Sequence, residues 1–295
     1  MVWVQKNFNL AWRNTSNNQK NVRAQDLRAG KAQLIKKIVE RSNSIKHTSV
    51  VIRLSSLIIE NKTLLSKFAE NLEILADNGL NLIVVHEYGN LLTKQLKLLG
   101  IDEKKYSPHF GDDQLSGLFE MVISGHINKR IVSKLCSLGV LAVGLSGKDG
   151  NLLVAKKSNH IAITGSWLYS TEPLLVNPEV LLAIEDTKIV PIISPVTCTE
   201  KGKTAILDAE ITSAMVAASV NASKLIITCE DDFLVNKVGV LSSVAELNYL
   251  LNSTIEVTVT DPLVKASKYA LLNSDITVQF VDARKNNALL FAIFD

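Results

Sequence analysis

The sequence predicts an α/β fold, a three-layer sandwich in which an open, mainly parallel sheet carries helices on both faces. From residue 30 onward, short apolar runs of strand length alternate with segments whose apolar residues have helical spacing. The runs are apolar at nearly every position, which is typical of strands buried on both faces. The 295 residues, 47% hydrophobic and 21% charged, are enough for one large domain or two lobes.

In the first half of the chain, helical and strand patterns alternate. Asn78-Gly79 is a typical helix end, and Gly100 closes the next helix. A long helical stretch follows, and we expect it to break near Gly125. The expected helices span residues 31–45, 63–79, 91–100 and 114–139, and the expected strands span residues 49–54 and 80–89.

The second half continues the alternation after a third strand that begins at residue 140. Residues 152–167 are strand-like, with a turn around Asn159. Ser243 with Glu246 is close to a capping box, and Pro262 suits a first helical turn. The expected helices span residues 178–187, 206–222, 242–253, 261–274 and 286–294, and the expected strands span residues 189–198, 224–232 and 276–282.

Composition argues against several classes of protein. A net charge of +3 is too small to indicate nucleic-acid binding. Cys136, Cys198 and Cys229 are far apart, which argues against a zinc site or a disulfide framework and favours a reducing compartment. The sequence contains no run of about 18 apolar residues, so we expect no membrane-spanning helix.

The N-terminal segment differs from the rest, because residues 1–25 contain no Asp or Glu but four basic residues. We expect a basic tail at residues 1–30, either solvated or packed on a partner, in a cytoplasmic protein. The alternative is an organellar targeting peptide, since a secretory signal would need an apolar core.

Polar features gather at the carboxyl ends of the predicted strands, where ligands bind in parallel sheets. These ends are the loops after residues 54, 86, 145 and 229. The strand at 49–54 runs into the polar pair Ser55-Ser56, as at many phosphate sites, but without glycine. The loop 144–151 has three glycines and Lys148, and it is either an anion site or a tight turn between strands.

Each candidate side chain also has a structural interpretation. His86 is either a base or a structural histidine at a strand end. Asp208 and Glu210 either stabilise the start of a helix by interacting with its dipole or organise lysines or a metal around phosphates. The acids at residues 230–232 either hold magnesium or line a solvated loop, and Lys265 is either a surface lysine or a phosphoryl-transfer residue.

Three stretches together resemble the acetylglutamate kinase branch of the amino acid kinase family, across residues 31–294. They are "EMVISGHINKRIVSKLCSLGVLAVGLSGKDGNLLVAKK", "VNPEVLLAIEDTKIVPIISPV" and "VQFVDARKNNALLFAIF". The resemblance implies one domain over residues 31–295. A lobe at about 31–195 would bind the amino-acid substrate, and a lobe at about 196–295 would bind ATP with magnesium. It also implies phosphorylation of the carboxylate of N-acetylglutamate in arginine biosynthesis, by a homo-oligomer, either a dimer or a hexamer.

The resemblance also assigns roles to individual residues. It implies Arg53, Lys265 and Glu210 as catalytic, with Arg53 where the family has lysine and Glu210 where it has aspartate. It implies substrate contacts from Gly89, His109 and Asp208, and phosphate or nucleotide contacts from Ser55, Ser56 and Asp231, with no residue implied as a metal ligand.

The departures from the family pattern fall mainly at the positions that the resemblance assigns to the phosphoryl group and the substrate. Ser55 and Ser56 replace paired glycines, and Glu87 and Tyr88 replace two of the glycines in "HGGG". Each added Cβ obstructs the approach of backbone amides to a phosphoryl group. His109 stands where the family has an arginine that clamps the substrate. Two hypotheses follow: a weak or retuned acetylglutamate kinase, or a non-catalytic binding or regulatory subunit.

Overall fold

The computed structural model describes residues 45–101, 113–157, 171–254, 258 and 261–294. All of them except Phe294 belong to one compact unit, residues 42–293. The predicted N-terminal tail and His109 lie outside the described residues, as does the predicted helix at 31–45 apart from Ile45.

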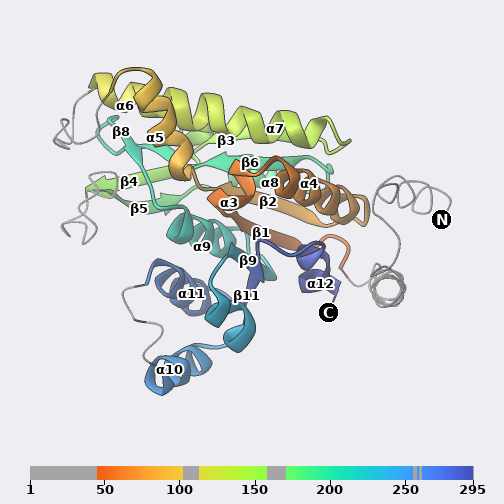
Figure 1. Cartoon of the computed structure of the whole chain (residues 1–295). Coiled ribbons are helices and arrows are strands. Elements are labelled where there is room, and N and C mark those ends of the chain that lie inside the picture. Colours follow the sequence, from red (N-terminus) through yellow and green to blue (C-terminus); the bar gives the residue numbers. More distant parts are fainter. Residues whose placement is uncertain (1–44, 102–112, 158–170, 255–257, 259–260, 295) are drawn as a thin grey trace. The chain divides into compact units, whose positions relative to one another are not determined.

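The main sheet has seven strands in the order β10-β11-β9-β1-β2-β6-β3 (Figure 1). Every pair is parallel except β10 with β11, so the predicted mainly parallel sheet is confirmed. The strands are β1 (Ser49–Leu54), β2 (Asn81–His86), β3 (Ala142–Ser146), β6 (Val190–Ser194), β9 (Lys224–Cys229), β10 (Val240–Leu241) and β11 (Thr277–Asp282).

A second sheet of four strands, in the order β5-β4-β7-β8, follows the carboxyl ends of β3 and β6. Only β4 and β7 are parallel in it. The periodicity predicted neither β5 nor β8, and it merged β6 with β7. The strands are β4 (Leu153–Lys157), β5 (Thr171–Val176), β7 (Val196–Thr199) and β8 (Thr204–Ile206).

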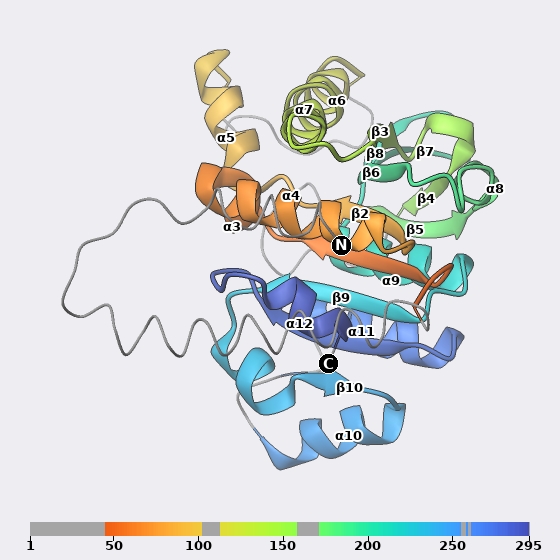
Figure 2. The ribbon, with the colours of Figure 1, turned by 90° about the vertical axis from the view of Figure 1, so that its right-hand side faces the viewer.

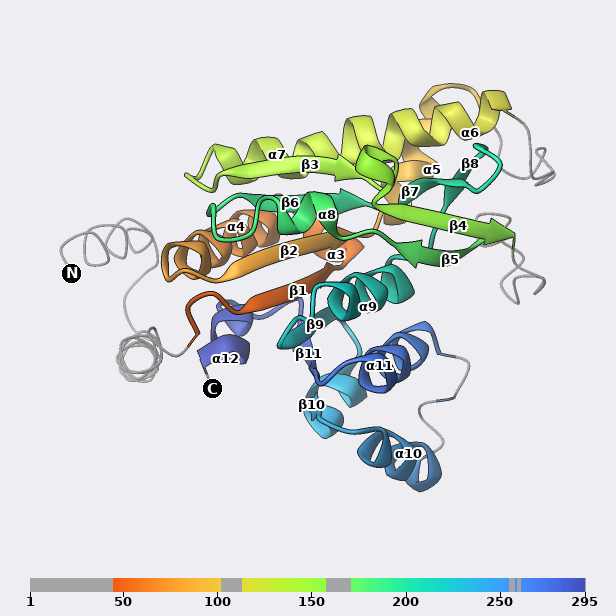
Figure 3. The same cartoon turned by 180° about the vertical axis from the view of Figure 1, so that it is seen from behind.

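Helices cover both faces of the main sheet, which confirms the layered fold. α9 (Ala209–Ser219) and α11 (Pro262–Asn273) lie on one face, and α4 (Lys62–Asp77) and α7 (Asn128–Cys136) lie on the other (Figures 1, 2 and 3). The remaining helices are α3 (Ser56–Glu60), α5 (Gly89–Leu98), α6 (Asp113–Glu120), α8 (Glu179–Leu182), α10 (Val244–Ser253) and α12 (Ala288–Phe294). Among the described residues, no helix has the length and apolar character needed to span a membrane.

Successive side chains along β1 point to opposite faces of the sheet, and this determines the direction of Arg53. All six residues of β1 are buried, because the strand lies in the middle of a covered sheet. Val51 belongs to the core under α9, and Arg53, two residues later, faces the same side. Asp208 caps α9 by accepting bonds from the amides of Glu210 and Ile211, at 2.8 and 3.3 Å. Strand register and helix start therefore bring Arg53 and Glu210 together.

Two expected helices differ from the prediction. The stretch expected to break near Gly125 continues as a helix, because residues Met121–Ile127 form a π-helical segment between α6 and α7. Such a segment takes up an extra residue without ending the helix. The helix expected at 178–187 is only four residues long, and Asp186 and Lys188 beyond it have left-handed backbone, each with φ of 61°.

Candidate active site

The candidate site lies at the carboxyl ends of β1, β2 and β9, the edge that the sequence predicted. Arg53 comes from β1, Glu87 follows β2, and Glu210 stands in the first turn of α9. The Arg53 Nη2 atom donates to one carboxylate oxygen of Glu87 and to one of Glu210. The structure therefore brings together the predicted residues Arg53 and Glu210, with Glu87 as a third member.

The Arg53 guanidinium is almost fully enclosed, with 7% of its side chain exposed. Its Nη1 atom donates to the Thr228 carbonyl at 2.7 Å. Its Nε atom is buried and has no hydrogen-bond partner among the described residues. Two of the three guanidinium nitrogens of Arg53 thus bond the protein itself, while the Nε atom is left without an acceptor among the described residues.

The backbone amides after β1 also have partners within the protein. The Ser55 amide donates to Thr228 Oγ1 at 2.9 Å, and the Ser55 hydroxyl donates to Glu230 at 3.0 Å. The Ser56 amide donates to the second oxygen of Glu87 at 2.6 Å. Because each amide already bonds an oxygen of the chain, neither is free to hold a phosphate in this structure.

Gly89 permits the close approach that carries Glu87 to Ser56. Its φ is +47°, and a Cβ at this position would overlap the Ser56 side chain. The next amide, that of Asn90, donates to Glu60 at 3.0 Å, and Glu60 also pairs with Lys94 at 2.9 Å. Gly89 was predicted to contact substrate. In the structure, the amide of the next residue already donates to a carboxylate of the chain.

Two carboxyl groups bond the Arg53 guanidinium and a third, that of Asp208, lies close enough to act on it, and their pKa values reflect this. Burial raises the pKa of Glu87 to about 7, although the charge of Arg53 works against it. Burial also raises the pKa of Asp208 to about 8, helped by its hydrogen bond with Glu210. For Glu210, burial would raise the pKa, but the charge of Arg53 outweighs it and holds that pKa well below its usual range. The site is therefore close to neutral and not strongly positive.

His86 is a structural residue in this fold. It is fully buried, its Nδ1 atom bonds the Glu87 carbonyl at 2.7 Å, and its Nε2 atom lies 3.2 Å from the side-chain amide of Asn128. A carbonyl can only accept, so Nδ1 carries the proton and Nε2 accepts from Asn128. Burial lowers the pKa of His86 to about 4, which keeps the ring neutral. This arrangement favours the structural alternative over a base.

The loop 144–151 is a connection between strands, from β3 in the main sheet to β4 in the second sheet. Lys148 pairs with Glu120 and donates to Thr204 Oγ1 at 2.8 Å. The Asp149 carboxylate accepts the Ser146 amide at 2.6 Å. A Cβ at Gly147 would lie 2.8 Å from the Val196 carbonyl. The turn interpretation fits these contacts, because Lys148 is used to tie the loop to its neighbours.

The acids after β9 each have a partner too. Asp231 accepts the Leu234 amide at 2.9 Å, and Asp232 pairs with Arg284. Arg284 also bonds Asp282 at the end of β11, at 2.8 Å. Among the described residues, no group of His, Cys, Asp or Glu is arranged to hold a metal ion. A magnesium ion that came with ATP would therefore be held by the phosphates and by at most one or two carboxylates of these described residues.

The structure does not join Lys265 to the cluster. Lys265 lies in the first turn of α11, its side chain is exposed, and no ion pair joins it to a described residue. Asp208 stands beside the cluster as the cap of α9. Sequence reasoning treated Glu87 only as a lost glycine and overlooked Thr228. The available signal for Glu87 was its position as an acid directly after a buried strand, beside an arginine on the adjacent strand.

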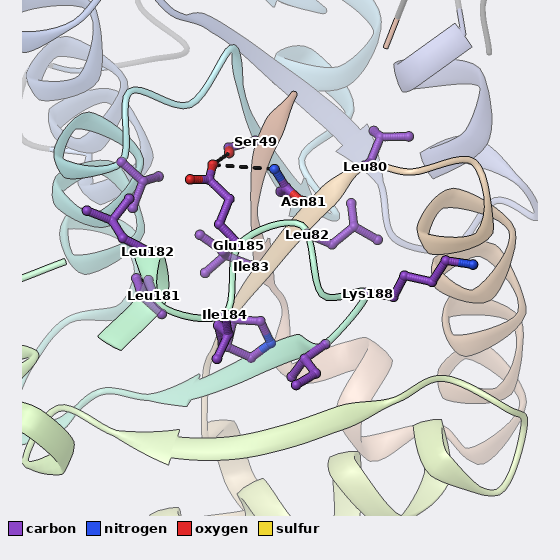
Figure 4. Close-up of a pocket in the computed structure, with 13 residues that line it drawn as sticks. Ser49, Leu80, Asn81, Leu82, Ile83, Leu181, Leu182, Ile184, Glu185 and Lys188 are labelled. Carbon is purple, nitrogen blue, oxygen red and sulfur yellow. Dashed lines mark hydrogen bonds between the residues drawn. The ribbon is translucent and has the colours of Figure 1, made fainter. Parts of the chain in front are cut away.

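A hollow lies at the opposite edge of the main sheet, where β1 and β2 begin (Figure 4). Ser49 and Asn81 both donate to the Glu185 carboxylate there, at 2.9 and 3.3 Å. These bonds fasten the loop after α8 across the start of the strands. The hollow includes none of the predicted site residues, so it is separate from the Arg53 cluster.

Similarity to known proteins agrees with the fold. The model of the amino acid kinase family matches residues 48–249. Acetylglutamate kinase of Parvibaculum lavamentivorans is 29% identical over 91% of this chain and 92% of its own length. Acetylglutamate kinase of Petrotoga mobilis is 32% identical over 83% of each chain.

Solved structures share the fold at lower identity. N-acetylglutamate synthase of Neisseria gonorrhoeae, complexed with coenzyme A and N-acetyl-glutamate, has a TM-score of 0.69 and 21% identity. That match covers 88% of this chain and 60% of the synthase chain. Carbamate kinase of Giardia lamblia, bound to AMP-PNP, has a TM-score of 0.57 and 13% identity, over 82% of this chain and 94% of its own. The chain belongs to the amino acid kinase family.

Proposed function

We propose that this chain is a non-catalytic member of its family, a binding or regulatory protein that keeps the fold and does not transfer phosphoryl groups. The observation that supports this most directly is the engagement of Arg53 by Glu87 and Glu210. Phosphoryl transfer depends on positioned positive charge around the moving group. Here the only guanidinium in the described cluster is neutralised by carboxylates of the chain.

Two further observations support the proposal. Lys265, the second positive charge that the family resemblance assigned, is exposed on α11 and forms no ion pair with Glu210 in the structure. The amides of Ser55 and Ser56 are bonded to Thr228 and Glu87. A transferring phosphoryl group would have to displace these bonds before any charge on it could be stabilised.

A coupled assay of ADP release, with ATP, magnesium and N-acetylglutamate, tests this proposal. Hydroxylamine in a parallel reaction would trap an acyl phosphate and exclude simple ATP hydrolysis. We expect the wild-type chain to stay at the background of a protein-free control. Turnover above background that Arg53→Ala abolishes would show that the site works and would refute the proposal.

The second candidate is an ATP-dependent acetylglutamate kinase of low activity, in a cytoplasmic pathway of arginine biosynthesis. Its support is the similarity to two acetylglutamate kinases over 83% to 91% of this chain. A nucleotide would then lie near β9 and β11, in the lobe proposed at residues 196–295. Under this candidate the same assay gives ADP release that depends on N-acetylglutamate and is lost in Lys265→Ala.

A further inference from the structure

We propose that the Glu87 carboxylate occupies an oxyanion seat formed by Arg53 and the Ser56 amide, and that an external oxyanion binds there when Glu87 leaves. The inference rests on the proposed function, because it names the ligand class and the control of the same site. It assigns Glu87 a role as an internal ligand that competes with the external one.

The geometry around Glu87 is that of a bound anion. One carboxylate oxygen accepts from Arg53 Nη2, and the other accepts from the Ser56 amide at 2.6 Å. Two donors from different elements, β1 and the start of α3, therefore converge on one small anionic group. A sulfate, a phosphate or a ligand carboxylate presents the same pair of acceptor oxygens.

A second observation points to a ligand independently. Arg53 is only 5% exposed, and its buried Nε atom has no acceptor among the described residues. A buried charged donor without a partner carries a free-energy cost, and native structures seldom leave one without a reason. A tetrahedral oxyanion has more acceptor oxygens than the Glu87 carboxylate, so it can reach Nε as well as Nη2.

Glu87 is also the member of the cluster that solvent reaches. Its side chain is 23% exposed, compared with 12% for Glu210 and 7% for Arg53. Glu87 can therefore move outward without unpacking the core. Glu210 remains on Arg53 after that movement, so the guanidinium keeps one internal partner while the seat opens.

The charges that face Glu87 favour its release together with proton uptake. Arg53 from β1 attracts it and Glu210 from α9 repels it, whereas Asp208, with a pKa of about 8, is mostly protonated at neutral pH, and Glu230 after β9 lies nearby on Ser55. Because the pKa of Glu87 is about 7, a modest fall in pH neutralises it and weakens its hold on Arg53. An anion then meets less competition for the seat.

Calorimetric titration with sulfate tests the inference, since sulfate keeps a constant charge between pH 6 and pH 8. We expect the wild-type chain to bind sulfate about tenfold more tightly at pH 6 than at pH 8, because the protonated fraction of Glu87 rises about tenfold. We expect Glu87→Gln to bind about tenfold more tightly than wild type at pH 8. Glu60→Gln, the same change on the adjacent loop, should shift the affinity by less than twofold.

The outcomes separate this inference from the proposed function. Equal affinity of wild type and Glu87→Gln at pH 8, in proteins with matching unfolding curves, would overturn it. Sulfate binding that persists in Glu87→Gln/Arg53→Met would reveal an adventitious ion only, and would also overturn it. The wild-type pH series needs no variant, so a flat series decides against the seat even if Glu87→Gln does not fold. ADP release tests phosphoryl transfer separately.

Discussion

Arg53 is buried and paired with two partly buried glutamates, and this combination is stable only while the partners remain. Taking a guanidinium out of water costs several kcal/mol, and close carboxylates offset that cost. Burial by itself would lower the pKa of Arg53, but the charges of Glu210 and Glu87 outweigh it and hold that pKa above its ordinary value. Arg53 is therefore as much a structural residue as a candidate functional one.

Replacing Arg53 by Met should destabilise the fold by about 3 kcal/mol at pH 7, because two partly buried carboxylates lose their counter-ion. Urea unfolding measures the change. Arg284→Met is the matched control, since Arg284 is 44% exposed and its ion pairs should contribute at most about 1 kcal/mol. Equal effects of the two variants would contradict a buried ion-pair network.

His86 should make stability fall as the solution becomes acidic. Its pKa is lowered from 6.5 to about 4 in the folded chain, so the unfolded chain takes up the proton first as pH falls. At roughly 1.4 kcal/mol per pKa unit, this costs about 3 kcal/mol between pH 6.5 and pH 4. The raised pKa of Glu87 acts in the opposite direction, since the folded chain holds that proton up to about pH 7.

The difference between wild type and His86→Gln therefore isolates the histidine. We expect the urea unfolding free energy of wild type to fall more steeply than that of the variant between pH 6.5 and pH 4.5. Parallel pH profiles of the two proteins would show that His86 is not buried in its neutral form.

At the scale of elements, the sequence predicted the main sheet better than the second one. β1, β2 and β9 are mostly apolar runs, and a strand buried on both faces leaves this local signature. β8 was missed because it has only three residues, and β5 because its sequence, TEPLLV, contains a glutamate and a proline that interrupt an apolar run. Such strands depend on pairing with neighbours, which a local pattern does not contain.

The loop that joins the two sheets depends on Gly147. A Cβ there would lie 2.8 Å from Leu153 Cβ, Thr197 Cβ and the Val196 carbonyl, all parts of paired strands or their ends. Gly147→Ala should destabilise by about 1–3 kcal/mol, because backbone has to shift. Gly117→Ala, on α6 with no atom within 4 Å of the added Cβ, should be neutral or stabilising by up to about 1 kcal/mol. Thermal unfolding compares the two, and a harmless Gly147→Ala would contradict the packing described.

At the scale of the whole molecule, order along the chain predicted which strand ends would meet, but not how the side chains would pair. The edge containing residues 54, 86 and 229 was predicted, because parallel strands place their carboxyl ends together. The pairing of Glu87 with Arg53 was not, since it depends on the rotamers of two long side chains and on the approach allowed by Gly89. The predicted tail and His109 lie outside the described residues.

We also predict a homo-oligomer that forms through β3. β3 is an edge strand of the described sheet, with β6 as its hydrogen-bonded neighbour, and Leu141 directly before it and Val143 within it are 60% and 37% exposed. Open, apolar edge strands tend to pair with another chain. Light scattering should give a dimer or a larger assembly for wild type and a smaller species for Val143→Lys. A monomeric wild-type chain would contradict this.

Calorimetry of ATP binding in the presence of magnesium, with and without N-acetylglutamate, shows whether Arg53 is held by carboxylates of the chain or open to ligands. If carboxylates of the chain hold Arg53, N-acetylglutamate should leave the affinity for ATP unchanged, since no shared phosphoryl seat couples the two ligands. Affinity for ATP that rises at least tenfold with N-acetylglutamate present, and returns to the lower value in Arg53→Ala, would show an open two-ligand site and contradict the account.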